Sequence, residues 1–267
     1  MYKAVVSDLD GTLLNGSHAI DEFTKETVSE VINRGIKFYI ATGRSYSGAK
    51  DIMDKLGLKI PLITSNGARI LDEEGNEIYV NNLEKKYSDS ILDIDYKKIG
   101  GNIVFNAYSG NDWYVTEDRR EFYMKINPKR TFFPEVATLE ELKTKKFTKI
   151  FFLGEHDELL ELEKEIENIT KGEVNIAFVL EHCLEIFSKE SDKANAARFL
   201  LEKDGLTLKD SVAFGDGCND YNLLKEAGKG YVMGNALYRL KEALPENETV
   251  ETNADNGVAK KLVELFL

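Results

Sequence analysis

The chain has 267 residues with 47 acidic and 35 basic side chains, and its formal net charge of -12 argues against broad binding to nucleic acid or anionic membranes. The length predicts one large or two medium domains, and 42% hydrophobic residues allow a sizeable core. The two cysteines, Cys183 and Cys218, form no disulfide framework, and no apolar run approaches the roughly 18 residues of a membrane-spanning helix. We therefore expect a soluble cytoplasmic protein.

Strands and helices alternate along the first part of the chain. A buried strand over 3–7 precedes a helix over 21–33, for which Asp21 is the expected N-cap. A second strand over 36–42 leads into a helix ending near Gly57, and "PLITSNG" (61–67) reads as a third strand. This alternation is typical of a parallel sheet covered by helices.

The pattern changes after residue 67 and returns after residue 188. Residues 68–81 predict a hairpin around Gly75, and the following mixture of strands and charged helices predicts an α+β unit with an antiparallel sheet. Strands and helices then alternate again, with a short strand over 250–253 before a closing helix over 257–267. The predicted fold is an α/β, Rossmann-like parallel-sheet core (1–82 and 187–267) with an inserted α+β domain (83–186).

Two aspartates follow the first strand, in "VVSDLDGTLL". In an extended chain, residues i and i+2 point to the same side, so Asp8 and Asp10 are expected to face one point beyond the strand end. Ligands bind at that end in open α/β sheets. The alternative is an ordinary acidic turn in which Asp8 acts as a cap.

Two further strand-to-helix junctions contain candidate anion-binding groups. In "ATGRS", Thr42 offers a hydroxyl, Gly43 allows close backbone approach, and a helix N-terminus follows. Lys193 is expected in the first turn of a helix capped by Ser191 or Asp192, where a cation opposes the helix dipole by roughly 0.3–1 kcal/mol. That conflict indicates a role elsewhere, such as neutralising carboxylates, although a solvated surface lysine also fits.

The fourth motif is "FGDGCNDYNLL", in which Asp216 ends a strand and Asn219 and Asp220 open a helix. Their oxygens suit a hard cation such as Mg²⁺, whereas the structural alternative is a turn followed by a helix cap. Because all four motifs follow strands of one predicted sheet or begin an adjoining helix, we expect their polar groups to converge at one edge.

The motifs "DLDGTLL", "ATGR", the lysine and "GDGCND" occur in an order that resembles the haloacid dehalogenase (HAD) superfamily of phosphohydrolases. The details resemble its Cof-type branch, which has a large α/β cap (C2, type IIB), and "LITSNGARILDEEGNEI", "VMGNA" and "NADNGVAKKL" also resemble that branch. The resemblance covers 1–82 and 187–267 and extends only to architecture over 83–186. It implies that residues 83–186 form the cap that sets substrate specificity.

The resemblance also implies roles for individual residues. Asp8 corresponds to the nucleophile and Asp10 to the general acid and base. Mg²⁺ is expected to bind the carboxylates of Asp8 and Asp216 and the main-chain carbonyl of Asp10. Asp220 is expected to bind it through a water molecule or to support the groups that bind it directly. The groups expected to hold phosphoryl oxygens are Thr42, Gly43, Lys193, Asn219 and the backbone of Leu9. Arg44 and Asn66 lie at predicted strand ends and are possible substrate contacts.

The predicted function is a Mg²⁺-dependent phosphatase for a small phosphorylated metabolite, such as a sugar phosphate, nucleotide or cofactor phosphate, acting through an aspartyl-phosphate. A phosphomutase using the same intermediate is one alternative. A non-catalytic phospho-acceptor protein is another, although receiver domains differ in the acidic pair and lack an insert of this size. The chain departs from the family pattern at Ala194, where glycine is common, and at Leu223, where methionine is common. We expect neither change to remove activity.

Overall fold

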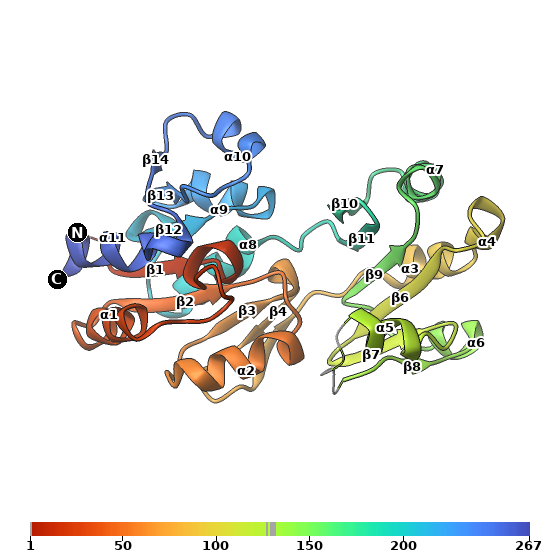
Figure 1. Cartoon of the computed structure of the whole chain (residues 1–267), viewed down its shortest axis with the longest axis horizontal. Coiled ribbons are helices and arrows are strands. Elements are labelled where there is room, and N and C mark those ends of the chain that lie inside the picture. Colours follow the sequence, from red (N-terminus) through yellow and green to blue (C-terminus); the bar gives the residue numbers. More distant parts are fainter. Residues whose placement is uncertain (1, 127, 129–131) are drawn as a thin grey trace. The chain divides into compact units, whose positions relative to one another are not determined.

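The computed structural model describes residues 2–126, 128 and 132–267, and its contacts divide the chain into two compact units (Figure 1). The core unit comprises Met1–Val80 and Glu190–Leu267, and the inserted unit comprises Asn81–Lys189. The sequence places the insert at 83–186, so its predicted ends lie within three residues of these bounds.

The core unit is built on a largely parallel sheet. Over the described residues its strand order is β14-β13-β12-β1-β2-β3-β4-β5, parallel from β14 to β3 and antiparallel from β3 to β5. The register places Ser7 of β1 beside Phe214 and Ile40, so the central strands end at the same edge. The strands are β1 (Ala4–Ser7), β2 (Lys37–Ala41), β3 (Leu62–Thr64), β4 (Arg69–Leu71), β5 (Glu77–Val80), β12 (Ser211–Gly215), β13 (Lys229–Val232) and β14 (Glu248–Thr249).

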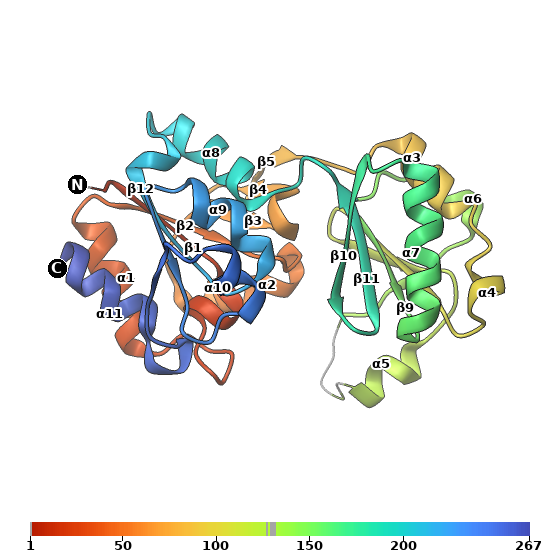
Figure 2. The same cartoon turned by 90° about the horizontal axis from the view of Figure 1, so that it is seen from above.

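Helices cover both faces of this sheet. Helices α1 and α11 lie side by side on one face, and α8 lies on the other, packed against α9 (Figure 2). Asp21 caps α1 as predicted, by accepting the backbone N–H of Thr24 at 2.8 Å, and Val28 and Val31 bury its apolar face. The core helices are α1 (Glu22–Asn33), α2 (Tyr46–Leu56), α8 (Lys193–Lys203), α9 (Tyr221–Glu226), α10 (Tyr238–Ala243) and α11 (Gly257–Phe266).

The inserted unit has its own sheet and core. Its strand order is β10-β11-β9-β6-β7-β8 over the described residues, antiparallel except for the β7–β8 pair. Phe105 and Phe152 are fully buried in its core, and α3 packs against α7. The elements are α3 (Lys85–Leu92), α4 (Tyr96–Ile99), β6 (Val104–Ser109), β7 (Asp112–Val115), α5 (Arg120–Ile126), β8 (Glu135–Val136), α6 (Leu139–Leu142), β9 (Lys149–Leu153), α7 (His156–Thr170), β10 (Val174–Leu180) and β11 (Cys183–Ser188).

The α/β fold class predicted from the sequence is confirmed, and one strand is displaced. The strand expected at 250–253 lies instead at Glu248–Thr249. Beyond it, the chain makes backbone bonds from Val250 N–H to Val232 O at 2.9 Å and from Gly234 N–H to Glu251 O at 3.3 Å before it turns toward α11. In the part of the chain that the structure describes, no helix combines the length and apolar character needed to cross a bilayer.

Candidate active site

Lys193 is the buried centre of the site. It begins α8, where the carboxylate of Asp192 caps the helix by accepting two backbone N–H groups of the first turn. The Lys193 ammonium donates to Asp8 Oδ1 at 2.5 Å and to Asp220 Oδ1 at 2.7 Å. The exposed fractions of these three side chains are 1%, 8% and 0%. Two carboxylates therefore compensate the unfavourable position of a lysine near a helix N-terminus, and the solvated-lysine alternative is wrong.

Asp220 also holds the loop that follows β12. Its Oδ2 accepts the backbone N–H groups of Asp216 and Gly217, both at 3.0 Å, so both of its oxygens have partners within the chain. Asp216 in turn reaches the first loop, where its Oδ1 accepts the Thr12 hydroxyl at 3.1 Å. Gly11 has φ of 71°, and a Cβ there would lie 2.3 Å from Asp216 Oδ2. The close approach of the two loops therefore requires glycine at this position.

Burial shifts the protonation equilibria of these groups. It raises the pKa of Asp8 to about 8, against the lowering effect of Lys193, and raises the pKa of Asp216 to about 6. The charge of Asp220 adds to both increases. Burial by itself lowers the pKa of Lys193, but the carboxylates of Asp220 and Asp8 raise it above its ordinary value. Another positive charge in this cluster would favour the ionised carboxylates.

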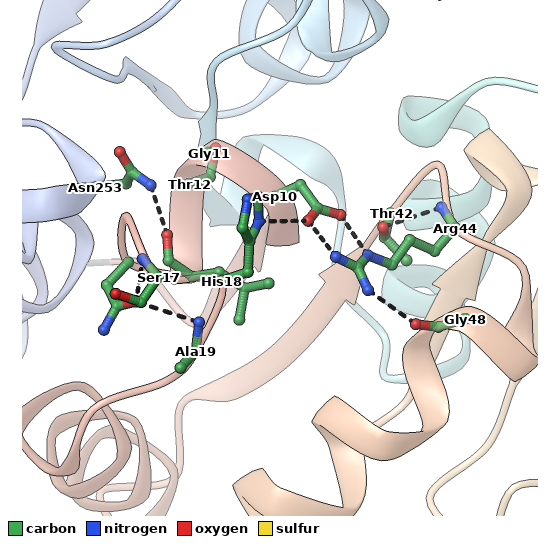
Figure 3. Close-up of polar contacts among 12 residues, drawn as sticks. Asp10, Gly11, Thr12, Ser17, His18, Ala19, Thr42, Arg44, Gly48 and Asn253 are labelled. Carbon is green, nitrogen blue, oxygen red and sulfur yellow. Dashed lines mark hydrogen bonds and ion pairs between the residues drawn. The ribbon is translucent and has the colours of Figure 1, made fainter. Parts of the chain in front are cut away.

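Asp10 is paired with a different cation (Figure 3). Arg44 donates Nε to Asp10 Oδ2 and Nη2 to Asp10 Oδ1, both at 2.6 Å, which is a bidentate pair. The hydrogen bond to Asp10 raises the pKa of Arg44, whose Nη1 also donates to the carbonyl of Gly48 at 3.0 Å. His18 places Nδ1 3.8 Å from Asp10 Oδ1, and the Asp10 side chain is 39% exposed. Asp10 thus lies on the solvent side of the site, whereas Asp8 is buried.

The prediction that both aspartates face one point assumed an extended chain through Asp10. Instead, β1 ends before Asp8, and the tight turn Leu9–Leu13 begins directly after it. Asp10 itself keeps extended backbone angles (φ −79°, ψ 129°), and the charges of Asp10 and Asp8 both raise the pKa of Arg44, so the expectation that the two carboxylates face one point stays a prediction. Two cations neutralise the two carboxylates separately, Lys193 at the first and Arg44 at the second.

The residues predicted to hold phosphoryl oxygens lie on these same loops. Leu9 is fully buried, so its side chain is not available to a ligand. Thr42 and Gly43 directly follow β2, and Thr42 Oγ1 accepts the backbone N–H of Arg44 at 3.1 Å. The Thr42 side chain is fully buried, and its oxygen accepts this bond, so the hydroxyl keeps a proton that it can donate.

Asn219 and Asn66 meet across two loops. Asn219 lies in the short turn Cys218–Asp220 and donates Nδ2 to Asn66 Oδ1 at 2.9 Å. Both residues proposed from sequence as possible substrate contacts, Arg44 and Asn66, are thus bonded to other predicted site residues.

Sequence reasoning missed two asparagines that hold the first loop. Asn235 donates Nδ2 to the carbonyl of Gly11 at 2.8 Å. Asn253, which Figure 3 shows, donates Nδ2 to the carbonyl of Leu14 at 2.7 Å. The two are linked, because the backbone N–H of Asn253 donates to Asn235 Oδ1 at 2.9 Å. Both lie in stretches, "VMGNA" and "NADNG", that resemble the family but suggest no chemistry by themselves.

The carboxylates form a set that fits a small divalent cation. Among the described residues, one oxygen each of Asp8, Asp216 and Asp220 lies within 4.8 Å of the others. Carboxylate oxygens are the hard ligands that Mg²⁺ and Ca²⁺ take. Because both oxygens of Asp220 already accept hydrogen bonds, Asp8 and Asp216 are the better direct ligands.

Comparison with known proteins places the chain in a family. A family model for haloacid dehalogenase-like hydrolases matches residues 5–262. A putative phosphatase from Buchnera aphidicola subsp. Baizongia pistaciae is 37% identical over 270 residues, covering 100% of this chain and 99% of that protein. An HMP-PP phosphatase from Yersinia pseudotuberculosis is 32% identical over 262 residues, covering 98% and 94%.

Solved structures agree with this placement. A protein from Thermotoga maritima has a TM-score of 0.85 at 28% identity, covering 99% of this chain and 98% of that one. A HAD subclass IIB sugar phosphatase has a TM-score of 0.81 at 22% identity, covering 98% of each chain, and shows the same fold. The chain belongs to the haloacid dehalogenase-like hydrolases, and the family predicted from its four motifs is confirmed.

Proposed function

We propose that the chain is a Mg²⁺-dependent phosphatase that hydrolyses a small phosphorylated metabolite through an aspartyl-phosphate on Asp8. The observation that carries this proposal is the buried pairing of Asp8 with Lys193, beside Asp216 and Asp220. Phosphoryl transfer depends mainly on positioning and on neutralising phosphoryl charge, and this cluster offers groups for both.

In the proposed reaction, a carboxylate oxygen of Asp8 attacks phosphorus, and the bond from phosphorus to the leaving oxygen breaks. Asp10 gives a proton to that oxygen and then takes one from the water that attacks the aspartyl-phosphate. Water adds to phosphorus, the bond to Asp8 breaks, and inorganic phosphate leaves. The exposure of Asp10 agrees with a leaving group on the solvent side.

The remaining groups hold the phosphoryl oxygens. We assign this role to Thr42, Gly43, Lys193, Asn219 and the backbone of Leu9. Mg²⁺, held by Asp8, Asp216 and the main-chain carbonyl of Asp10, would neutralise phosphoryl charge. Asp220 would support the site by holding Lys193 and the Asp216 loop, since both of its oxygens have those partners.

The inserted unit is proposed to be the cap that selects the leaving group. The net charge of -12 supports a small-molecule substrate over nucleic acid or a membrane surface. Both cysteines, Cys183 and Cys218, are free thiols, which supports a cytoplasmic location. The Yersinia relative is named for HMP-PP, so this compound belongs in the first substrate panel.

The test measures phosphate released from a metabolite panel by the full chain, with Mg²⁺ and with EDTA. We expect turnover only with Mg²⁺, and a loss of at least about a thousandfold in Asp8→Asn. Asp51→Asn is the matched control, since it makes the same change at an exposed carboxylate of α2. Full turnover by Asp8→Asn would refute the nucleophile, and no release from any phosphate ester would refute the proposed function.

A further inference from the structure

The turn Ser65–Gly67, which follows β3, has an unusual backbone. Ser65, Asn66 and Gly67 have φ of 50°, 56° and 95°, so two adjacent non-glycine residues occupy the left-handed region. Residues with a Cβ pay an energetic penalty there, although asparagine tolerates it better than most. Such strain persists only where the surroundings hold it in place, and it is a reason to ask what the turn does.

Two of the site loops hold this turn. The N–H of Ser65 donates to the carbonyl of Arg44 at 2.8 Å, and the N–H of Asn66 donates to the carbonyl of Thr42 at 3.1 Å. Gly67 packs against the residue before Lys193, because a Cβ on Gly67 would lie 2.3 Å from the carbonyl oxygen of Asp192. The turn is therefore wedged between the loop after β2 and the start of α8.

The side chain of Asn66 reaches a third loop. Its Oδ1 accepts Nδ2 of Asn219 at 2.9 Å, and a Cβ on Gly43 would lie 3.0 Å from the same oxygen. At the other end of the Asn219 amide, a Cβ on Gly217 would lie 2.4 Å from Oδ1. The Asn219 amide is thus constrained at both ends: Nδ2 is hydrogen-bonded to Asn66, and Oδ1 lies close to the backbone of Gly217.

We infer that Asn66 is a positioning residue for phosphoryl binding, which orients the Asn219 amide and ties it to the Thr42–Gly43 loop. The inference rests on the proposed function, in which those three residues hold phosphoryl oxygens. It adds to the prediction of Asn66 as a direct substrate contact, because the hydrogen bond to Asn219 uses Oδ1 and does not involve Nδ2. The left-handed turn matters because it directs this side chain between the two loops.

The test is Asn66→Gly in the full chain, because glycine accepts the left-handed backbone and removes only the side chain. With p-nitrophenyl phosphate as substrate, we expect KM, and Ki for inorganic phosphate, to rise about five- to tenfold. We expect kcat to change less than about twofold, since Asp8 and Asp10 are untouched. The melting temperature should not fall. Asn256→Gly is the matched control, since Asn256 also has positive φ (59°) and caps no helix with its side chain.

A double-mutant cycle separates positioning from a general structural role. In an Asn219→Ala background, Asn66→Gly should have no further effect on KM or Ki, because the amide that it orients is gone. Additive losses, or an unchanged KM in Asn66→Gly, would overturn the inference. If the wild type shows no turnover, only the proposed function is refuted. The inference can still be tested, because the rise in melting temperature caused by inorganic phosphate can be measured for both Asn66→Gly and the wild type.

Discussion

Replacing Lys193 by methionine removes the cation from the buried carboxylates. Its Nζ lies 2.5 Å from Asp8 and 2.7 Å from Asp220, and all three side chains are less than a tenth exposed. Methionine is an unbranched side chain of similar length and adapts to irregular space, so effects of lost volume stay small. The substitution therefore tests mainly the charge of Lys193.

The structure predicts a large effect. Removing one partner of a buried ion pair costs about 3–5 kcal/mol. Two ionised carboxylates at the 4.8 Å limit of this cluster repel each other by about 3.5 kcal/mol at an effective dielectric of 20, and protonation relieves part of this. At about 2–4 °C per kcal/mol for a chain of this size, the melting temperature should fall by roughly 6–20 °C. Turnover should fall at least about a hundredfold.

The assay is thermal unfolding with EDTA and with Mg²⁺, together with phosphate release. Mg²⁺ should restore part of the lost stability in Lys193→Met, because it supplies positive charge to the same carboxylates. Lys203→Met is the control, since it makes the same change at an exposed position of α8 and should have little effect. If both variants melt within about 2 °C of the wild type and keep comparable turnover, the reasoning is refuted.

Three further predictions follow from the site. Arg44→Met should slow hydrolysis of alkyl phosphates by about tenfold or more and affect p-nitrophenyl phosphate less. Arg44 holds Asp10, and only the poorer leaving group, the alkoxide, needs a well-placed acid. Equal losses on the two substrates would contradict this. Gly11→Ala should abolish turnover because its Cβ would meet Asp216, whereas Gly35→Ala, at φ of 83° in open space, should lower only stability. In EDTA, the melting temperature should fall as pH rises from about 5 to 8. The reason is that burial raises the pKa of Asp8 to about 8 and of Asp216 to about 6, so the folded state binds more protons than the unfolded state. A flat or rising curve, or the same fall in Asp8→Asn, would contradict it.

The sequence alone determined the fold class and the family. Strand–helix alternation, the cap at Asp21 and the hairpin around Gly75 are local patterns, and the structure shows each of them. The order of the four motifs identified the family, because this order can be read from the chain without knowing any distance between residues in space. Where the signal is short, as for the two-residue strand β8 or the edge strand β14, no local pattern marks the element, and prediction missed or misplaced it.

Only the tertiary structure decided which charges and amides meet. Lys193 contacts Asp8 across 185 residues, and Asn219 contacts Asn66 across 153, and no periodicity in the chain specifies such pairs. The separate cations of the two aspartates were also hidden, because Arg44 lies 34 residues from Asp10 and Lys193 lies 185 residues from Asp8 along the chain. Local propensity determines where a strand ends, but the partner of each side chain depends on how the sheet aligns the loops that follow its strands.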